Sequence, residues 1–186
     1  KIEEDEGGFR IGCMATLHDI ETHEGLNKEF QNLFKEAVRH IVGVQFRNCA
    51  TIGGSIFPKL GFSDVLTAFL ACDTQVILYK KGEVPLREFI YIPTDNDILT
   101  HLYVKKDGRK TAYESFRMTE TDFPTITCAM AKTQDGFETV LGARPKHAEV
   151  VVDEVVADAF SSEEVSDYAK RVIGKLQYGS NIRGSE

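Results

Sequence analysis

The chain has 186 residues, of which 42% are hydrophobic and 27% charged, with a formal net charge of −7 at pH 7. These values are typical of a globular protein with one large domain or two small ones, and the negative charge argues against binding to the phosphates of nucleic acid. No apolar run approaches the roughly 20 residues needed to cross a membrane, and the acidic start of the chain does not read as a signal peptide. We therefore expect a cytoplasmic protein with no membrane span and no nucleic-acid partner.

The first half of the chain predicts alternating strands and helices. In chain order we expect a strand at 9–15, helical structure at 16–41, an extended stretch at 42–55, a helix at 63–73 and a strand, turn and return segment at 74–90. The long helical stretch carries one apolar stripe, formed by Leu26, Phe30, Leu33, Phe34, Ala37, Val38 and Ile41. Ser63 or Asp64 is a natural N-cap for the second helix.

A composition shift at residues 91–97 predicts a boundary between two domains, 1–92 and 93–186. Beyond it we expect two strands at 98–118 about Asp107-Gly108, a hairpin at 125–144 about Asp135-Gly136, and helical structure at 148–176. Within this last stretch Ser161 and Ser162 start a second helix, for which Glu164 completes a capping box. The predicted class is α+β, an antiparallel sheet with helices followed by a smaller hairpin sheet with C-terminal helices.

The four cysteines, at positions 13, 49, 72 and 128, are far apart in the sequence. No two have CxxC spacing, and no histidine lies nearby at ligand spacing, so we expect no metal site. An even number leaves a disulfide open, but a chain of this size does not depend on one. Buried free thiols are therefore expected.

The stretch CATIGGSIFPKLGFSDVL, residues 49–66, combines adjacent glycines with a later carboxylate. Gly53 and Gly54 can adopt positive φ and turn two N–H groups toward one anion, such as a phosphate. Asp64 would repel a phosphate, but it suits a ribose hydroxyl or an adenine amino group. The pair suggests a nucleotide site, but these residues alone favour a structural hairpin followed by an N-cap, because short glycine motifs have many false positives.

Several segments of the sequence resemble a known protein family. VGVQFRNCATIGGS followed by SDVLTAFLACDTQVIL resembles the FAD-binding subunit of the molybdenum hydroxylases, the family of xanthine dehydrogenase and carbon monoxide dehydrogenase. Residues that match its pattern in order are Gln45, Arg47, Asn48, Thr51, Ile52, Gly53, Gly54, Ser63 and Asp64. The segments RIGCMATLHDIE, DILTHLYV, AYESF, DFPTITCAM and NIRGSE are also similar to the family.

The resemblance implies a set of cofactor-binding residues and no acid, base or nucleophile. Residues 51–55 (Thr51, Ile52, Gly53, Gly54 and Ser55) would meet the FAD pyrophosphate, with serine where the family usually has asparagine. Asp64 would bind the adenosine end, while Ile41 and Leu99 would lie against the flavin, although ordinary core packing also explains these two residues. Ser115 stands where the family has a lysine.

The resemblance also implies an oxidoreductase that works with other chains. FAD would receive electrons from an iron–sulfur subunit, next to a large molybdopterin-binding subunit, and pass them to NAD or another acceptor. The family's first pyrophosphate loop has no counterpart in this sequence, so we expect a fragment that is inactive alone. The alternative is an FAD-free scaffold or interaction module of the same fold.

Overall fold

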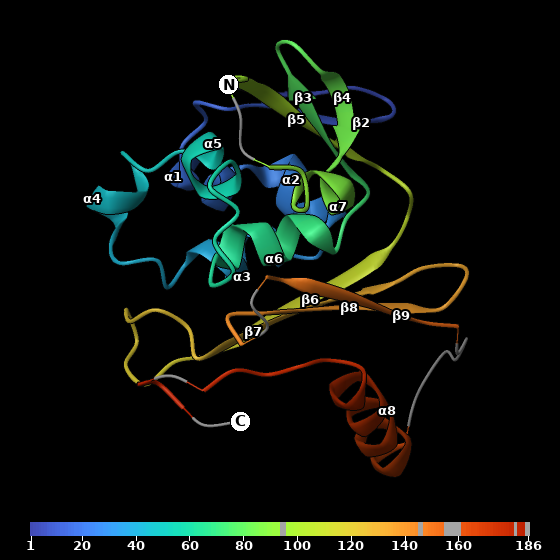
Figure 1. The fold of residues 1–186 in the computed structure, drawn as a ribbon. Helices are drawn as coiled ribbons and strands as arrows, with labels where there is room; N and C mark the ends of the chain where they lie inside the picture. Colours follow the sequence, from blue (N-terminus) through green and yellow to red (C-terminus); the bar gives the residue numbers. More distant parts are fainter. Residues whose placement is uncertain (94–95, 145–146, 155–160, 181, 185–186) are drawn as a thin grey trace.

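Two antiparallel sheets enclose a layer of helices in the computed structural model (Figure 1), which describes residues 1–93, 96–144, 147–154, 161–180 and 182–184. The first sheet has the strand order β1-β2-β5-β3-β4 and the second has the order β6-β7-β8-β9. The strands are β1 (Ile2–Glu4), β2 (Gly8–Gly12), β3 (Thr74–Leu78), β4 (Gly82–Pro85), β5 (Leu99–Lys105), β6 (Lys110–Phe116), β7 (Ile126–Lys132), β8 (Phe137–Gly142) and β9 (Glu149–Asp153). This arrangement confirms the predicted α+β class.

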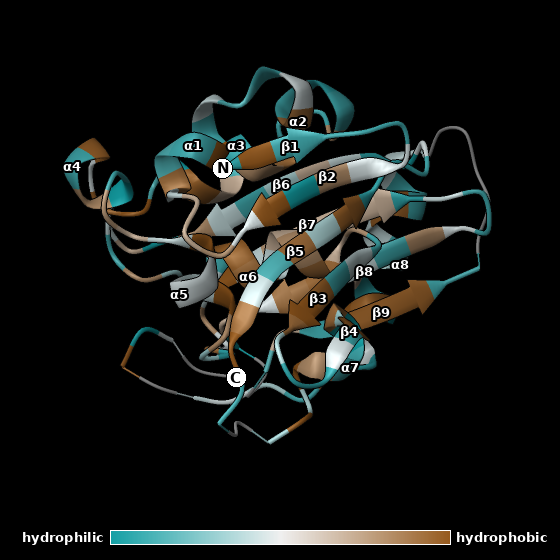
Figure 2. Ribbon diagram, turned by 90° about the horizontal axis from the view of Figure 1, so that it is seen from above, coloured by the Kyte–Doolittle hydropathy of each residue, from teal (hydrophilic) through white to brown (hydrophobic). Residues whose placement is uncertain are grey.

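Seven helices lie in the first half of the described chain and one near its end. They are α1 (Leu17–Thr22), α2 (Glu24–Glu29), α3 (Leu33–Val38), α4 (Val44–Arg47), α5 (Ile52–Ile56), α6 (Asp64–Leu70), α7 (Leu86–Phe89) and α8 (Ser162–Gly174). Helix α8 lies beneath the second sheet, on the face away from the other helices, whereas α4 stands apart at the edge of the molecule (Figures 1 and 2).

Helix α6 is the centre of the core. It packs on α3 and on the second sheet, and all seven of its residues are buried, as a helix enclosed on every side requires. The Ser63 hydroxyl caps it by accepting a hydrogen bond from the Leu66 N–H at 3.1 Å, which confirms the predicted start. The rings of Phe34 and Phe69, 4.5 Å apart, join α6 to α3. This packing fixes Asp64 at the first turn of α6.

The prediction of one helical stretch over 16–41 is correct in its apolar stripe but wrong in its continuity. The chain forms three short helices, separated by His23 and by the left-handed residues Gln31 and Asn32. The buried Asn27 stabilises these breaks, because its side chain donates to the carbonyls of Ile20 and His23 and accepts from the Lys35 N–H. Polar side chains thus replace the helical hydrogen bonds that a single rod would have made.

The prediction of an extended stretch over 42–55 is wrong. This region contains α4 and α5, and the β-prone residues Val44 and Ile52 are helical. Capping explains why residues 52–56 are helical and not extended, since the Thr51 side chain accepts a hydrogen bond from the Gly54 N–H at the start of α5. A local cap has prevailed over the strand preference of the apolar residues.

The division expected near residue 93 is not where the two sheets separate. Strand β5 lies inside the first sheet, paired with both β2 and β3, so the chain passes to the second sheet only at residues 106–109. Asp107-Gly108 is therefore a connection between sheets and not the hairpin turn that was predicted. The hairpin at Asp135-Gly136 is confirmed, with Gly136 at a φ of +139° between β7 and β8.

The C-terminal region is helical only in part. Residues Glu149–Asp153 form β9, an antiparallel partner of β8, where a helix was expected. The run of three valines at 150–152 favours a strand, because β-branched residues pack well on a pleated sheet. The predicted helix start at Ser161 is confirmed with its Glu164 capping box, while the expected helix at 155–160 lies outside the described residues.

A largely buried ionic network ties α7, the end of α6 and the Asp107-Gly108 connection to strand β8 of the second sheet. Arg109 donates to Asp107, to Glu138 at 3.2 Å and to the Ala71 carbonyl at 2.5 Å. Arg87 binds the same Glu138 with both terminal nitrogens, at 3.1 and 2.5 Å. Burial alone would raise the pKa of Glu138, but the hydrogen bonds and charges of the two arginines outweigh it and hold that pKa below its usual 4.5.

We expect the free energy of unfolding to fall in acid, partly through Glu138. Because the folded-state pKa of Glu138 is lowered, its contribution is present above the unfolded-state pKa and is lost as the pH falls through the folded value. Urea denaturation between about pH 5 and pH 3 should therefore give a flatter stability curve for Glu138→Gln than for the native chain. Parallel stability curves for the two proteins would contradict this contribution of Glu138 to stability.

The four cysteines are free thiols in the structure. Cys72 is buried, and burial raises the pKa of its thiol far above the usual value. Cys13 and Cys128 are half-buried, and burial raises the pKa of Cys128 to about 11. Cys49 is exposed, which corrects the expectation that all four would be buried.

Candidate functional site

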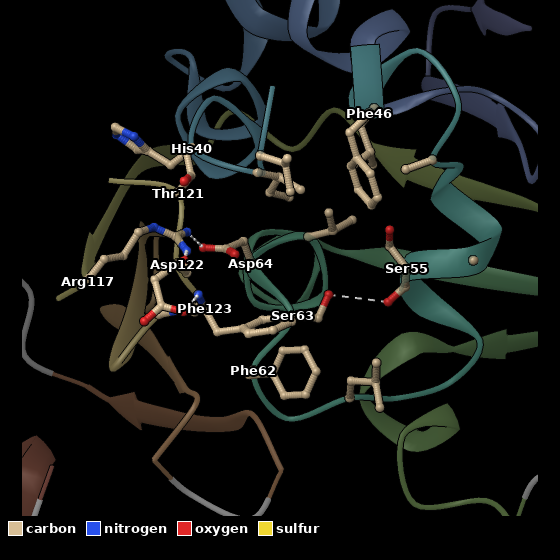
Figure 3. Close-up of a pocket in the computed structure, with 18 of the residues that line it drawn as sticks. His40, Phe46, Ser55, Phe62, Ser63, Asp64, Arg117, Thr121, Asp122 and Phe123 are labelled. Atoms are coloured by element: carbon tan, nitrogen blue, oxygen red, sulfur yellow. Dashed lines mark hydrogen bonds and ion pairs between the residues drawn. The ribbon is translucent and has the colours of Figure 1, made fainter. Parts of the chain in front are cut away.

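A pocket of about 420 Å³ opens where four segments meet between the helical layer and the second sheet (Figure 3). The segments are the chain after α3 (40–46), the start of α5 (50–55), the loop into α6 (60–65) and the loop after β6 (117–124). Helix α1 adds Leu17. The pocket thus brings together elements that are far apart in the sequence.

The walls of the pocket are mostly apolar and partly uncovered. Phe46 on α4 is 49% exposed and Phe123 is 54% exposed. The rings of Phe62 and Phe123 meet edge to face at 4.8 Å, which ties the loop after β6 to the loop into α6. Exposed aromatic side chains around a concave surface are typical of a site for a largely apolar, planar ligand.

The turn at residues 51–55 differs from the anion nest expected from its glycines. Neither Gly53 nor Gly54 has positive φ, because both lie in α5. The Gly53 N–H donates to the Cys13 carbonyl at 2.8 Å, and the Gly54 N–H donates to the Thr51 hydroxyl at 3.1 Å. The Ser55 N–H donates to the Thr51 carbonyl. The amides are already engaged, so the nest was a wrong prediction.

The two glycines have different reasons for lacking a side chain. A Cβ at Gly53 would lie 2.9 Å from both the Cβ and the carbonyl oxygen of Cys13, so this glycine allows α5 to pack on the loop after β2. A Cβ at Gly54 would meet only the Thr51 hydroxyl, at 3.2 Å, and Gly54 lines the pocket. Bare backbone at Gly54 therefore lets a ligand approach α5 closely.

A polar corner faces these apolar walls. Asp64 Oδ1 accepts a hydrogen bond from the Tyr113 hydroxyl at 2.5 Å and forms an ion pair with Arg117. Arg117 also donates to the Asp122 carbonyl at 2.7 Å, and its buried Nε atom has no hydrogen-bond partner among the described residues. Burial raises the pKa of the Asp64 carboxyl, and the neighbouring Tyr113 and Arg117 only partly offset this effect.

Five of the eight residues expected at the site line this one pocket. They are Ile41, Thr51, Gly54, Ser55 and Asp64.

The other three, Ile52, Gly53 and Leu99, do not line the pocket. Ile52 and Leu99 are buried in the hydrophobic core, and Gly53 faces Cys13.

Sequence reasoning missed the residues that the loop after β6 contributes. Arg117 and Phe123 belong to this loop and reach the pocket from the second sheet. Strand alternation gives a weak signal for Arg117, because it continues the face of β6 on which Tyr113 lies. Phe123 lies in DFPTITCAM, a segment similar to the family, but the sequence predicted no role for this residue.

In the part of the chain that the structure describes, no three or more His, Cys, Asp or Glu side chains gather where they could hold a metal ion. None of the described helices is both long enough and apolar enough to span a membrane.

Comparison with known proteins identifies relatives over most of the chain. Residues 1–104 match the family described as the FAD binding domain in molybdopterin dehydrogenase. The chain is 27% identical to the glyceraldehyde dehydrogenase medium chain of Sulfolobus acidocaldarius, covering 96% of this chain and 69% of that protein. It is 25% identical to YgfM of Escherichia coli K12, covering 75% of this chain and 52% of YgfM.

Two solved structures share the fold. Carbon monoxide dehydrogenase from Hydrogenophaga pseudoflava matches with a TM-score of 0.86 and 23% identity, and quinoline 2-oxidoreductase from Pseudomonas putida 86 matches with 0.88 and 16%. Each alignment covers 100% of this chain and 70% of the other chain.

The sequence spans only part of these relatives, about half the length of YgfM and about 70% of the chains in the two solved structures. The family match nevertheless covers more than half of the sequence and includes α5, Gly54 and Asp64. The chain therefore belongs to the family of FAD-binding domains of molybdopterin dehydrogenases, and its cofactor is FAD.

Proposed function

We propose that the pocket between α5, α6 and the loop after β6 holds FAD, in the flavin-binding subunit of a molybdenum-containing hydroxylase or dehydrogenase. The observation that carries this proposal is Gly54, whose bare backbone opens into a pocket with aromatic walls inside the region that matches the family. The residues present fit such a cofactor, because FAD combines an apolar ring system with polar phosphates and sugar hydroxyls.

The five gathered residues take different parts in this proposal. Thr51, Gly54 and Ser55 form an edge of α5 that is open to the pyrophosphate. The lack of a side chain at Gly54 lets the pyrophosphate approach closely, and no free amide is needed to bind it. Asp64 serves the adenosine end, since an ionised carboxylate has acceptor sites beyond those used by Tyr113 and Arg117. Ile41 lies on the wall proposed for the flavin ring.

In this proposal the cofactor does not contact Ile52, Gly53 or Leu99, because these residues do not line the pocket. Ile52 and Gly53 contribute by holding α5 in place. The Gly53 N–H binds the Cys13 carbonyl, and the Ile52 N–H binds the Ala15 carbonyl at 2.9 Å.

When bound, FAD supplies chemistry that links one-electron carriers such as iron–sulfur clusters to two-electron acceptors such as NAD. We propose that the protein works in the cytoplasm beside an iron–sulfur subunit and a large molybdopterin-binding subunit, as in xanthine dehydrogenase. The role of this chain is to hold the ring, to exclude water from its apolar wall and to provide a cation, Arg117, at the polar corner. The 186 residues alone are proposed to be inactive.

Purification of the natural full-length protein from its host tests this proposal. We expect a yellow protein with one flavin per chain that co-purifies with molybdenum and iron. A colourless protein would contradict the FAD site and favour the FAD-free scaffold. A yellow monomer without molybdenum or iron would leave FAD binding in place and overturn the electron-transfer role.

A further inference from the structure

One wall of the pocket is carried by a protruding segment with a strained backbone. Residues 39–50 run from α3 to α5 and contribute Ile41, Val42 and Phe46 to the pocket. Val42 has a φ of +52°, in the left-handed region, although it is β-branched and 55% exposed. Such a residue adopts this conformation only where its surroundings enforce it, and such residues concentrate at functional sites.

Arg47 makes polar contacts on both sides of this strained point. Its Nε and Nη2 atoms donate to the two carboxylate oxygens of Glu21 on α1, at 2.8 and 3.0 Å. Its Nη1 atom donates to the carbonyl of Ile41, the residue just before Val42, at 3.3 Å. Arg47 is 9% exposed, unlike its neighbours on α4. One guanidinium thus joins the helical layer to the strained point of the segment.

We propose that the Arg47–Glu21 pair is a latch that holds Ile41, Val42 and Phe46 in position against the ring of the bound cofactor. This inference rests on the proposed FAD site and adds two positioning residues, neither of which contacts the ligand. A bidentate contact to a fixed carboxylate restricts both position and rotation, which a lysine at the same place cannot do. The position of this wall therefore depends on the bidentate geometry of the Arg47 guanidinium and not only on its positive charge.

A reporter in the ligand-free chain tests the latch without any flavin. The chain has no tryptophan, so Phe46→Trp introduces a single indole on the wall. In this background Arg47→Lys should raise the mobility of the indole in the folded state, seen as lower fluorescence anisotropy and about twofold or more faster quenching by acrylamide. Arg39→Lys is the matched control, since Arg39 forms an exposed pair with Glu36 on α3 and should change neither quantity.

The strain at Val42 provides a second variant. Val42→Asn, added to Arg47→Lys, should restore part of the lost rigidity, because asparagine tolerates the left-handed region. An unchanged reporter in Arg47→Lys, or no recovery on adding Val42→Asn, overturns the latch.

A binding measurement on the full-length protein with native Phe46 then tests the role at the ring. Arg47→Lys should weaken FAD roughly tenfold and leave the affinity for ADP, which lacks the ring, unchanged. Equal losses for FAD and ADP would show general destabilisation and overturn the positioning role. If the native protein binds no FAD, the proposed function fails, and the reporter still decides whether the latch exists.

Discussion

The Gly54→Val variant is expected to lose FAD and to keep its fold. A Cβ at Gly54 meets only the Thr51 hydroxyl, which must give way by a few tenths of an ångström, and the rest of the valine enters the pocket. The added side chain occupies the space proposed for the pyrophosphate, so we expect affinity for FAD to fall by more than about tenfold. Flavin absorbance of the purified full-length variant, with circular dichroism to verify folding, measures both effects.

Two other glycines act as controls for this experiment. Gly174→Val at the end of α8 introduces the same side chain where no atom lies within 4 Å, and it should retain FAD. Gly53→Ala should lower the free energy of unfolding, because its Cβ meets Cys13 at 2.9 Å. A Gly54→Val protein with one FAD per chain would exclude this part of the pocket as the cofactor site.

Replacement of Arg109 should have the largest effect on stability among the substitutions considered. Arg109→Ala removes the guanidinium that binds Asp107 and Glu138, and the Ala71 carbonyl loses its donor. Breaking one partner of a buried ion pair leaves uncompensated charge, which costs about 3 kcal/mol. Urea denaturation of the native chain and the variant would give this difference.

An exposed ion pair provides the comparison for Arg109. Lys170 pairs with Asp167 on α8, and both side chains are more than half exposed, so Lys170→Ala should cost less than about 0.5 kcal/mol. Adding Glu138→Gln to Arg109→Ala should cost less than the sum of the two single changes, since the two residues are in contact. An Arg109→Ala variant as stable as Lys170→Ala would refute a structural role for the network.

Local signals in the sequence predicted those parts of the fold that local contacts decide. The N-cap at Ser63, the hairpin at Asp135-Gly136 and the capping box of Ser161 with Glu164 each depend on residues within a few positions of one another. The strand pattern of β5 was also read correctly, but its partners β2 and β3 were not, because period-2 alternation does not say which strand lies alongside.

The same limit applies to the site. Thr51, Ser55 and Asp64 could be found because they lie in one short motif at the starts of α5 and α6. Arg117 and Phe123 could not, since only the packing of α6 on the second sheet brings their loop to the pocket. The glycine pair looked like an anion nest because no sequence pattern shows that Cys13 packs against Gly53.

The position of β5 in the middle of the first sheet has a consequence for synthesis on the ribosome. Strand β2 ends at Gly12, but its inner neighbour begins only at Leu99, so the whole of 13–98 must be translated first. At ordinary elongation rates this takes on the order of ten seconds, during which β2 has an unpaired edge that invites aggregation. A nascent chain or an expressed piece that stops at residue 92 should therefore need a chaperone, whereas one that reaches residue 105 can complete the sheet.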